Sequence, residues 1–283
     1  MRWMKNMKNA KYILFFLLLA LVVIIGIWAF TPAASPKWTG FGPYDPTING
    51  PRSKTLWDWL DLLIVPLVLS FGVLFLSSAE KESEKQVELD RQRQSTLDLF
   101  INQISNLVLE NDLKSKKVKG EIRAIARTYT LGALRRLDKE RKAEALQFLL
   151  ESGLIENEPA IRLKGANLRE ASLENAELVG AEIKGAYFCN ANFKQANLTE
   201  TNLCGCDLSL VDFTQANFRN TDLSYTFLKN AKLQNVDLTK ANLDWADVEG
   251  ADLTGAKLLR EQYDRLVHLD KAKFPRKDLP PYL

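Results

Sequence analysis

Residues 196–215 read ANLTETNLCGCDLSLVDFTQ, and a large apolar side chain returns at every fifth position of this stretch. The same spacing continues without a break from Leu163 to Leu258. A smaller or β-branched residue lies two positions before each of these apolar residues, starting with Ile161. We call the two sets the central residues and the small residues. The central residues are Leu163, Leu168, Leu173, Leu178, Ile183, Phe188, Phe193, Leu198, Leu203, Leu208, Phe213, Phe218, Leu223, Leu228, Leu233, Leu238, Leu243, Val248, Leu253 and Leu258.

A period of five matches neither the 3.6-residue period of an α-helix nor the two-residue period of a strand. It predicts a solenoid in which each quintet forms one side of a square coil and twenty residues complete one coil. Five such coils, stacked at the inter-strand spacing of ~4.8 Å, would form a rod roughly 24 Å long. The residue before each central residue is often Asn or Asp, which bonds to nearby backbone in turns. Asn202, Asp222 and Asn242 should therefore stack on one side.

Units such as ANLRE (166–170), ANFKQ (191–195) and VDLTK (236–240) resemble the pentapeptide-repeat family. This resemblance implies a right-handed quadrilateral β-helix. The upstream stretches TLWDWLDLLIVPLVLS and ARTYTLGALRRLDKERKAEALQFLLESGLI look like the anchor and adaptor of two-span bacterial members, common in cyanobacteria. The expected fold is a membrane-anchored α + β chain with two transmembrane helices, a small helical adaptor and the β-helix. The expected domains are an anchor (1–78), a charged adaptor (79–158), a β-helix (159–258) and a C-terminal cap and tail (259–283).

Two apolar runs predict the membrane anchor. Tyr12–Phe30 is uncharged, and its 19 residues would reach ~28 Å as a helix, close to the hydrocarbon thickness of a bilayer. A cleaved signal peptide is the alternative, but the apolar core is too long for one and no small-x-small site precedes Ser35. The second run, Leu60–Ser78, contains Pro66 and is interrupted only by Asp61. Preceding tryptophans favour a position at the water interface for its acidic end.

Basic residues crowd the first eleven positions and are sparser in the loop between the two runs. The positive-inside rule then predicts an integral membrane protein with both termini cytoplasmic, in a bacterial inner membrane or an internal, thylakoid-type membrane.

Beyond the anchor, apolar residues of 97–108 recur with the 3, 4, 3 spacing of one buried helix face. Val118–Leu137 and Lys139–Ser152 carry apolar faces that could cover it, which predicts a small helical bundle. A coiled-coil dimer through 97–108 is the competing interpretation. Asp138 should cap the last helix and Gly153 should end it.

Residues 114–142 carry eleven basic and three acidic side chains. One reading is contact with anionic lipid headgroups, and the other is neutralisation by the acidic helix of 80–112. The candidate headgroup contacts are Lys114, Lys116, Lys117, Lys119, Arg123 and Arg127.

Catalytic and metal chemistry find little support in the sequence. The three cysteines do not suggest a disulfide framework: Cys206 is a small residue of the repeat, and Cys189 and Cys204 occupy outward positions. The only histidine, His268, follows the last repeat, so a histidine-rich metal site or a Ser/His/Asp triad is poorly supported. We therefore expect no enzyme activity, no metal and no cofactor.

The favoured function is a membrane-tethered scaffold that presents a rigid rod to an unidentified protein partner. Membrane lipids are the other expected partners, nucleic acid is not expected, and homo-oligomerisation is left open. The alternative is a DNA-mimicking regulator of a type II topoisomerase, because some soluble pentapeptide-repeat proteins are such binders. Residues 162–257 carry only ten basic and thirteen acidic side chains, a net charge of −3. The candidate partner patch is Tyr225, Phe227 and Trp245, unless the C-terminal tail folds back and covers these rings.

Overall fold

The computed structural model describes residues 56–115 and 117–274, and side chains from residue 69 onward except residue 71. The chain divides into two compact units, Met1–Lys85 and Gln86–Leu283. The predicted span Tyr12–Phe30, the loop that follows it and Lys116 all lie outside the described residues.

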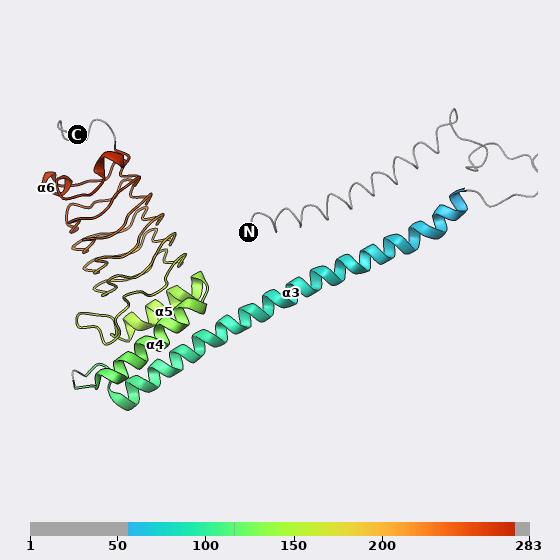
Figure 1. Ribbon diagram of the computed structural model, residues 1–283, viewed down its shortest axis with the longest axis horizontal. Coiled ribbons are helices and arrows are strands. Elements are labelled where there is room, and N and C mark those ends of the chain that lie inside the picture. Colours follow the sequence, from blue (N-terminus) through green and yellow to red (C-terminus); the bar gives the residue numbers. More distant parts are fainter. Residues whose placement is uncertain (1–55, 116, 275–283) are drawn as a thin grey trace, which may run out of the picture. The chain divides into compact units, whose positions relative to one another are not determined.

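The helices are α3 (Leu56–Asn111), α4 (Gly120–Arg136), α5 (Lys139–Glu151), the short α6 (Arg260–Tyr263) and the 3-10 helix η2 (Leu269–Lys271) (Figure 1). The second predicted span, Leu60–Ser78, is helical and falls within α3. None of the described helices combines the length and the hydropathy that a membrane crossing needs. The two-span anchor is therefore not confirmed and stays a prediction.

Within the second unit, the end of α3 packs with α4 and α5. Leu97, Phe100 and Ile104 of α3 are buried in the same apolar core as Leu134 of α4 and Leu149 of α5. The helical face predicted from residues 97–108 is thus covered by the chain's own helices. This packing is the bundle that the sequence predicts, and the competing coiled-coil dimer through the same face does not fit it.

The predicted ends of α5 are confirmed. The Asp138 carboxylate accepts a hydrogen bond from the backbone N–H of Arg141 at 3.1 Å, as an N-cap does. Gly153 has φ +61°, the left-handed conformation that ends many helices and that glycine adopts without a side-chain clash.

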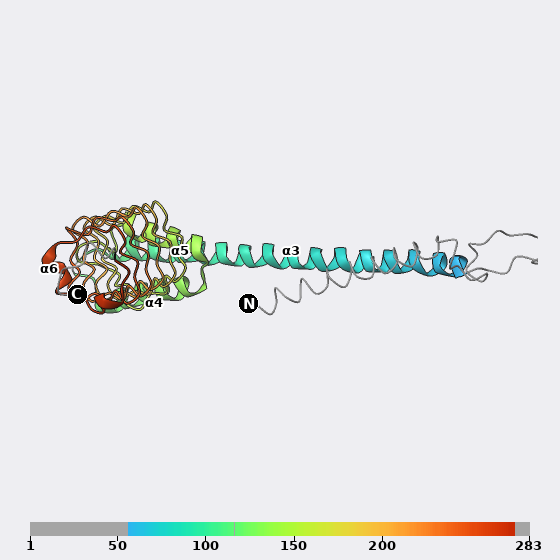
Figure 2. The same ribbon diagram turned by 90° about the horizontal axis from the view of Figure 1, so that it is seen from above.

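The repeats form stacked coils, which Figure 1 shows side-on and Figure 2 along a second direction. Residues twenty apart pair as isolated parallel bridges, for example Asn167 with Tyr187 and Asn202 with Asp222. No regular strand forms among the described residues, so these single bridges hold the coils together. Every central residue is buried except Leu258, which is half-buried. The twenty-residue coil and its inward register are confirmed.

The corners of the coils follow one backbone rule. Most central residues accept, at their C=O, a hydrogen bond from the backbone N–H of the small residue three positions on, as Leu163 does from Ala166 at 2.8 Å. The residue just before that donor has positive φ from Gly165 to Gly255 at every fifth position except Lys240. A central residue and the three residues after it thus form a β-turn of type II, which needs φ above zero at its third residue.

The first coil is capped by side chains of the helical adaptor. Arg127 of α4 donates to the carbonyls of Arg162 at 3.1 Å and Lys164 at 2.7 Å. Lys142 of α5 donates to the carbonyl of Arg169 at 2.8 Å. The open carbonyls at the start of the solenoid are thereby satisfied by cations, which form strong hydrogen bonds.

The tail caps the other end, as expected, and the described part ends at Phe274. It forms a partial sixth coil in which Val248 N donates to Val267 O at 3.0 Å. The buried side chain of Gln262 donates to the carbonyls of Leu238 and Ala241, each at 2.8 Å, at the corner where the last coil begins. The ring of Tyr263 packs against that of Phe274, with centroids 5.7 Å apart.

Candidate functional site

The three residues predicted as a partner patch are among the most exposed apolar side chains of the repeat segment. Tyr225 is 58% exposed, Phe227 is 54% exposed and Trp245 is 62% exposed. Tyr225 and Trp245 occupy the same corner of consecutive coils, and Tyr225 N donates to Asp244 O at 2.9 Å. Phe227 lies just past that corner on the adjoining side. We call these three residues the aromatic corner.

The described part of the tail leaves the aromatic corner uncovered. Its apolar residues Leu266, Leu269 and Phe274 pack against the end of the solenoid core, and its backbone continues the coil ladder. Trp245 N donates to Arg265 O at 3.0 Å, so the tail stacks on the last coil in register and does not fold back along the rod. The alternative in which this part of the tail covers the three rings is therefore wrong.

Below the aromatic corner, the same edge of the rod is lined by glycines. Gly165, Gly185 and Gly205 precede Tyr225 in the column, all with positive φ. The corner conformation is thus met by glycine in the first three coils and by large rings in the next two. Sequence reasoning placed these residues in one column but had no signal for the backbone conformation.

Carboxylates around the aromatic corner are held by the backbone and by neighbouring side chains. Asp207 and Asp222 accept from the N–H groups of Ser209 at 3.1 Å and Ser224 at 3.0 Å. Asp222 also accepts from the side chain of Asn242 at 3.1 Å, within the predicted stack. These residues serve the turns, as the sequence indicated.

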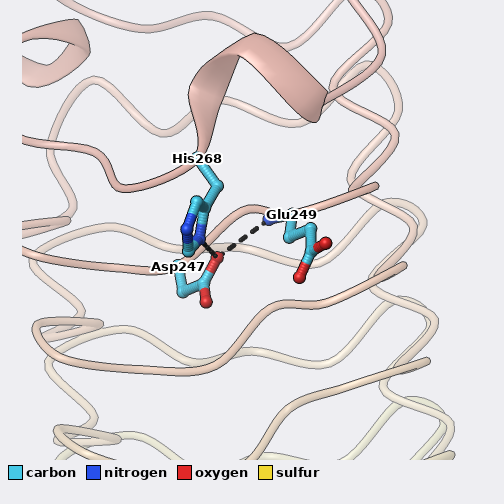
Figure 3. A group of neighbouring side chains, drawn as sticks. All are labelled: Asp247, Glu249 and His268. Atoms are coloured by element: carbon cyan, nitrogen blue, oxygen red, sulfur yellow. Dashed lines mark hydrogen bonds and ion pairs between the residues drawn. The ribbon is translucent and has the colours of Figure 1, made fainter.

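A cluster that the sequence did not predict lies on the side of the rod that carries Phe227. The ligand atoms of Asp247, Glu249 and His268 lie within 4.8 Å of one another (Figure 3). His268 Nδ1 is 2.9 Å from Asp247 Oδ1. Glu249 is paired with Lys229 at 3.0 Å and with Lys271 at 3.6 Å. The hydrogen bond from Lys229, followed by the charges of both lysines, lowers the pKa of Glu249.

The cysteines lie where the repeat register put them. Cys206 is buried, its thiol contacts the carbonyl O of Ile183 at 3.0 Å, and burial raises its pKa to about 12. Cys189 and Cys204 are half-buried, and all three are free thiols. Cys206 is thus a neutral core residue.

The basic segment divides between exposed and structural side chains. Lys114, Lys117 and Lys119 are exposed. Arg123 and Arg127 are half-buried, and Arg123 donates to the carbonyl of Ser115 at 2.9 Å. Arg127 caps the first coil, so both of these candidate headgroup contacts also make hydrogen bonds within the chain.

The other interpretation of the basic segment, neutralisation by the acidic helix, is supported for one arginine. Arg141 pairs with Asp90 of the acidic part of α3 at 2.7 Å and with Asp138 at 2.6 Å. The hydrogen bond that Arg141 donates to Asp90 raises the pKa of Arg141. The acidic helix therefore neutralises part of the segment and leaves the exposed lysines near its start.

A family model described as "Pentapeptide repeats" matches residues 161–195, 196–235 and 216–255, with eight copies. No curated protein matches the chain. Among solved structures, full-length QnrB1, a plasmid-mediated fluoroquinolone resistance protein, is 21% identical with a TM-score of 0.25, over 42% of this chain and 62% of that one. Rfr23, a pentapeptide repeat protein from the cyanobacterium Cyanothece 51142, is 26% identical with a TM-score of 0.21, over 33% of this chain and 60% of that one. Another from Nostoc Pcc 7120 is 21% identical with a TM-score of 0.25, over 46% of this chain and 94% of that one.

Proposed function

We propose that this chain, whose residues 161–255 are pentapeptide repeats, is a non-enzymatic scaffold that presents its rod to a protein partner. The observation that carries this proposal is the aromatic corner, whose three rings are the most exposed large apolar side chains of the described repeats. Exposed rings clustered among polar residues are typical of interaction surfaces, and Tyr and Trp are enriched among the residues that dominate binding energy.

The backbone at the aromatic corner supports this reading. Tyr225 and Trp245 have φ values of 57° and 60°, in the left-handed region. The fold needs this conformation at each corner, and glycine or asparagine meets it at lower steric cost. Two large rings at such positions gain little from packing, since both are more than half exposed. A role in contacting another molecule explains why the chain carries them there.

The two caps support the rod as a rigid platform. Arg127 and Lys142 close the first coil, and Gln262 closes the last one. A surface held by a hydrogen-bonded ladder loses little conformational freedom on binding, so more of the contact energy becomes affinity. The partner would therefore meet a preformed surface.

The tether is the second part of the proposal. The apolar runs of 12–30 and 60–78, with basic residues ahead of the first, favour an anchor in a bacterial inner or internal membrane and cytoplasmic termini. The exposed Lys114, Lys117 and Lys119 are then the side chains available for anionic headgroups.

The DNA-mimic alternative ranks below the scaffold, because residues 162–257 have a net charge of only −3 and some of their carboxylates are paired with cations. Asp212 lies 3.0 Å from Lys232 and 3.7 Å from Lys194. Asp244 lies 2.9 Å from Arg265. A surface that imitates phosphates needs carboxylates whose charge is not cancelled nearby. Potent inhibition of gyrase supercoiling by the unit Gln86–Leu283 would reverse this ranking.

The test exchanges the rings without disturbing the corners. Trp245→Asn and Tyr225→Asn place a residue that tolerates the left-handed conformation, so the fold should be kept. Gln215→Asn, at a corner on the opposite side of the rod with φ 63°, is the control. We expect a protein recovered with the full chain from solubilised native membranes to be lost with the two ring variants and kept with the control. Equal recovery with all three would refute the patch.

A further inference from the structure

We propose that Asp247, Glu249 and His268 form a binding site for one divalent transition-metal ion of the Zn²⁺ type. This inference is independent of the proposed scaffold role. It rests on three ligand-bearing side chains that the coil stacking brings together from two separate segments (Figure 3).

The repeat explains how two of the ligands share one side. Asp247 and Glu249 flank the central residue Val248, whose side chain points into the core. Because side chains alternate across an extended backbone, both carboxylates point outward on the same side of the rod. The Asp247 carboxylate is further held by the backbone N–H of Glu249 at 3.1 Å.

The tail supplies the third ligand. Val267 pairs with the coil below through hydrogen bonds from its N–H to Ala246 O at 2.9 Å and from Val248 N–H to its own C=O at 3.0 Å. The next residue, His268, is therefore fixed above the carboxylate pair. Figure 3 shows its imidazole turned toward Asp247, with the Nδ1–Oδ1 distance of 2.9 Å.

The donor set selects the class of metal. An imidazole nitrogen with two carboxylate oxygens suits Zn²⁺ and neighbouring first-row ions, whereas Ca²⁺ and Mg²⁺ prefer six or more oxygen ligands. Ligand atoms bound tetrahedrally at ~2.1 Å from Zn²⁺ lie ~3.4 Å apart. The present separations of up to 4.8 Å require only small side-chain rotations. Three protein ligands would leave a position for water or for a group of a partner.

Two lysines compete with the metal for Glu249. Lys229 lies 3.0 Å from one carboxylate oxygen of Glu249, and Lys271 lies 3.6 Å from the other. Both ammonium side chains are more than half exposed, at 55% and 52%. Exposed ion pairs of this kind contribute little, so the lysines can move into water when a metal enters. The pairing nevertheless makes a sharp prediction, because removal of either lysine should strengthen metal binding.

A metal here would join the fifth coil to the tail. Asp247 and Glu249 belong to the repeat, and His268 belongs to the segment that caps it. A ligand that binds only the folded arrangement stabilises it by mass action. Bound metal should therefore raise the melting temperature of the cap and the rod together.

The experiment titrates ZnCl₂ into the full chain by calorimetry. The chain is purified without a histidine tag and carries Cys189→Ser and Cys204→Ser, so that these thiols do not bind zinc. We expect one saturable site per chain, with no comparable heat from MgCl₂. His268→Gln should weaken binding roughly tenfold or more, since loss of even a supporting partner costs on the order of 10–100-fold in metal affinity. Lys271→Gln should tighten binding.

Controls separate the site from general attraction to carboxylates. Asp237→Asn removes an exposed carboxylate from another side of the rod and should leave the titration unchanged. Glu249→Gln removes a second proposed ligand, on an outward side chain of the repeat. It therefore tests the site even if His268→Gln disturbs the tail. Absence of saturable one-to-one binding, or identical affinity in the parent, His268→Gln and Glu249→Gln, would overturn the proposal.

Discussion

At the residue scale, the repeat assigns opposite roles to leucines two positions apart. Leu208 is a central residue with no exposed surface, whereas Leu210 lies at a corner, 52% exposed with φ 61°. Leu208→Asp would bury an unpaired charge and should lower the free energy of unfolding by roughly 3 kcal/mol or more. Leu210→Asp places a residue that tolerates the corner conformation in water, so its effect should be within about 0.5 kcal/mol. Denaturant unfolding measures both, and equal destabilisation would contradict the register.

The cysteines give a second prediction at this scale, through their reactivity. Cys206 is buried, and its pKa is raised from 9.0 to about 12. The neutral thiol in the core therefore adds fully to the free energy of unfolding below pH 9.0, and this contribution is lost as the pH rises from 9.0 to about 12. Thiolates are the reactive form. Iodoacetamide at pH 8 should therefore modify Cys189 and Cys204 in the folded chain and Cys206 only after unfolding. Mass spectrometry of the digested chain reads this out, and early labelling of Cys206 would show an open core.

The spacing of apolar residues predicted which individual residues lie in the core, but it did not predict the backbone conformation at the corners or the position of the tail. It located Leu208 and Cys206 inside because burial depends on the five-residue period alone. It had no signal for the positive φ of Tyr225 and Trp245, since backbone conformation at a corner is imposed by stacking and not by those side chains. His268 could not be placed beside Asp247 for a similar reason: the tail joins the ladder through backbone hydrogen bonds, which every residue type except proline can form.

At the scale of elements, the adaptor and the solenoid depend on each other. Arg127 and Lys142 hold three carbonyls of the first coil from positions 27 to 37 residues away in the sequence. A basic helix next to an acidic one suggested lipid contact or neutralisation, and no local pattern indicates that a guanidinium caps a distant coil. The structure therefore assigns two of the basic residues to the fold.

This dependence predicts how variants of α4 behave. Arg127→Ala removes two charge-assisted hydrogen bonds and leaves carbonyls of the first coil without that partner, which should cost about 2 kcal/mol. Arg135→Ala changes an exposed arginine of the same helix and should cost little. Thermal melting of the unit Gln86–Leu283 compares the two. A fragment that begins at Ala160 lacks the whole cap and should melt at a lower temperature than this unit, whereas an unchanged melting temperature would show that the first coil needs no cap.

At the scale of the whole molecule, the two apolar runs near the start of the chain determine the predicted cellular location of the rod. Tyr12–Phe30 was predicted from hydropathy alone and lies outside the described residues, so its role rests on length and charge. A rod fixed by the proposed anchor would meet a membrane-bound partner within a thin layer, where a surface as small as the aromatic corner can suffice because tethering raises the effective concentration. The direction of the predicted anchor would therefore decide which compartment holds the proposed partner.

The predicted topology places the loop near Gly42 outside the cytoplasm and all of unit Gln86–Leu283 inside it. The test uses a chain with Cys189→Ser and Cys204→Ser, in which Cys206 stays buried. A membrane-impermeant maleimide added to intact cells should label Gly42→Cys and should not label Thr254→Cys, an exposed position of the rod, until the cells are opened. Basic residues ahead of the first apolar run are the physical reason, because such residues are retained on the cytoplasmic side. In an inner membrane, labelling of Gly42→Cys only after lysis would show that the hairpin is wrong. In an internal membrane the loop is lumenal, and labelling of Gly42→Cys from the cytoplasmic side of isolated membranes would show the same. Labelling of both positions in intact cells would place the rod, and with it the aromatic corner, on the outer side of the membrane.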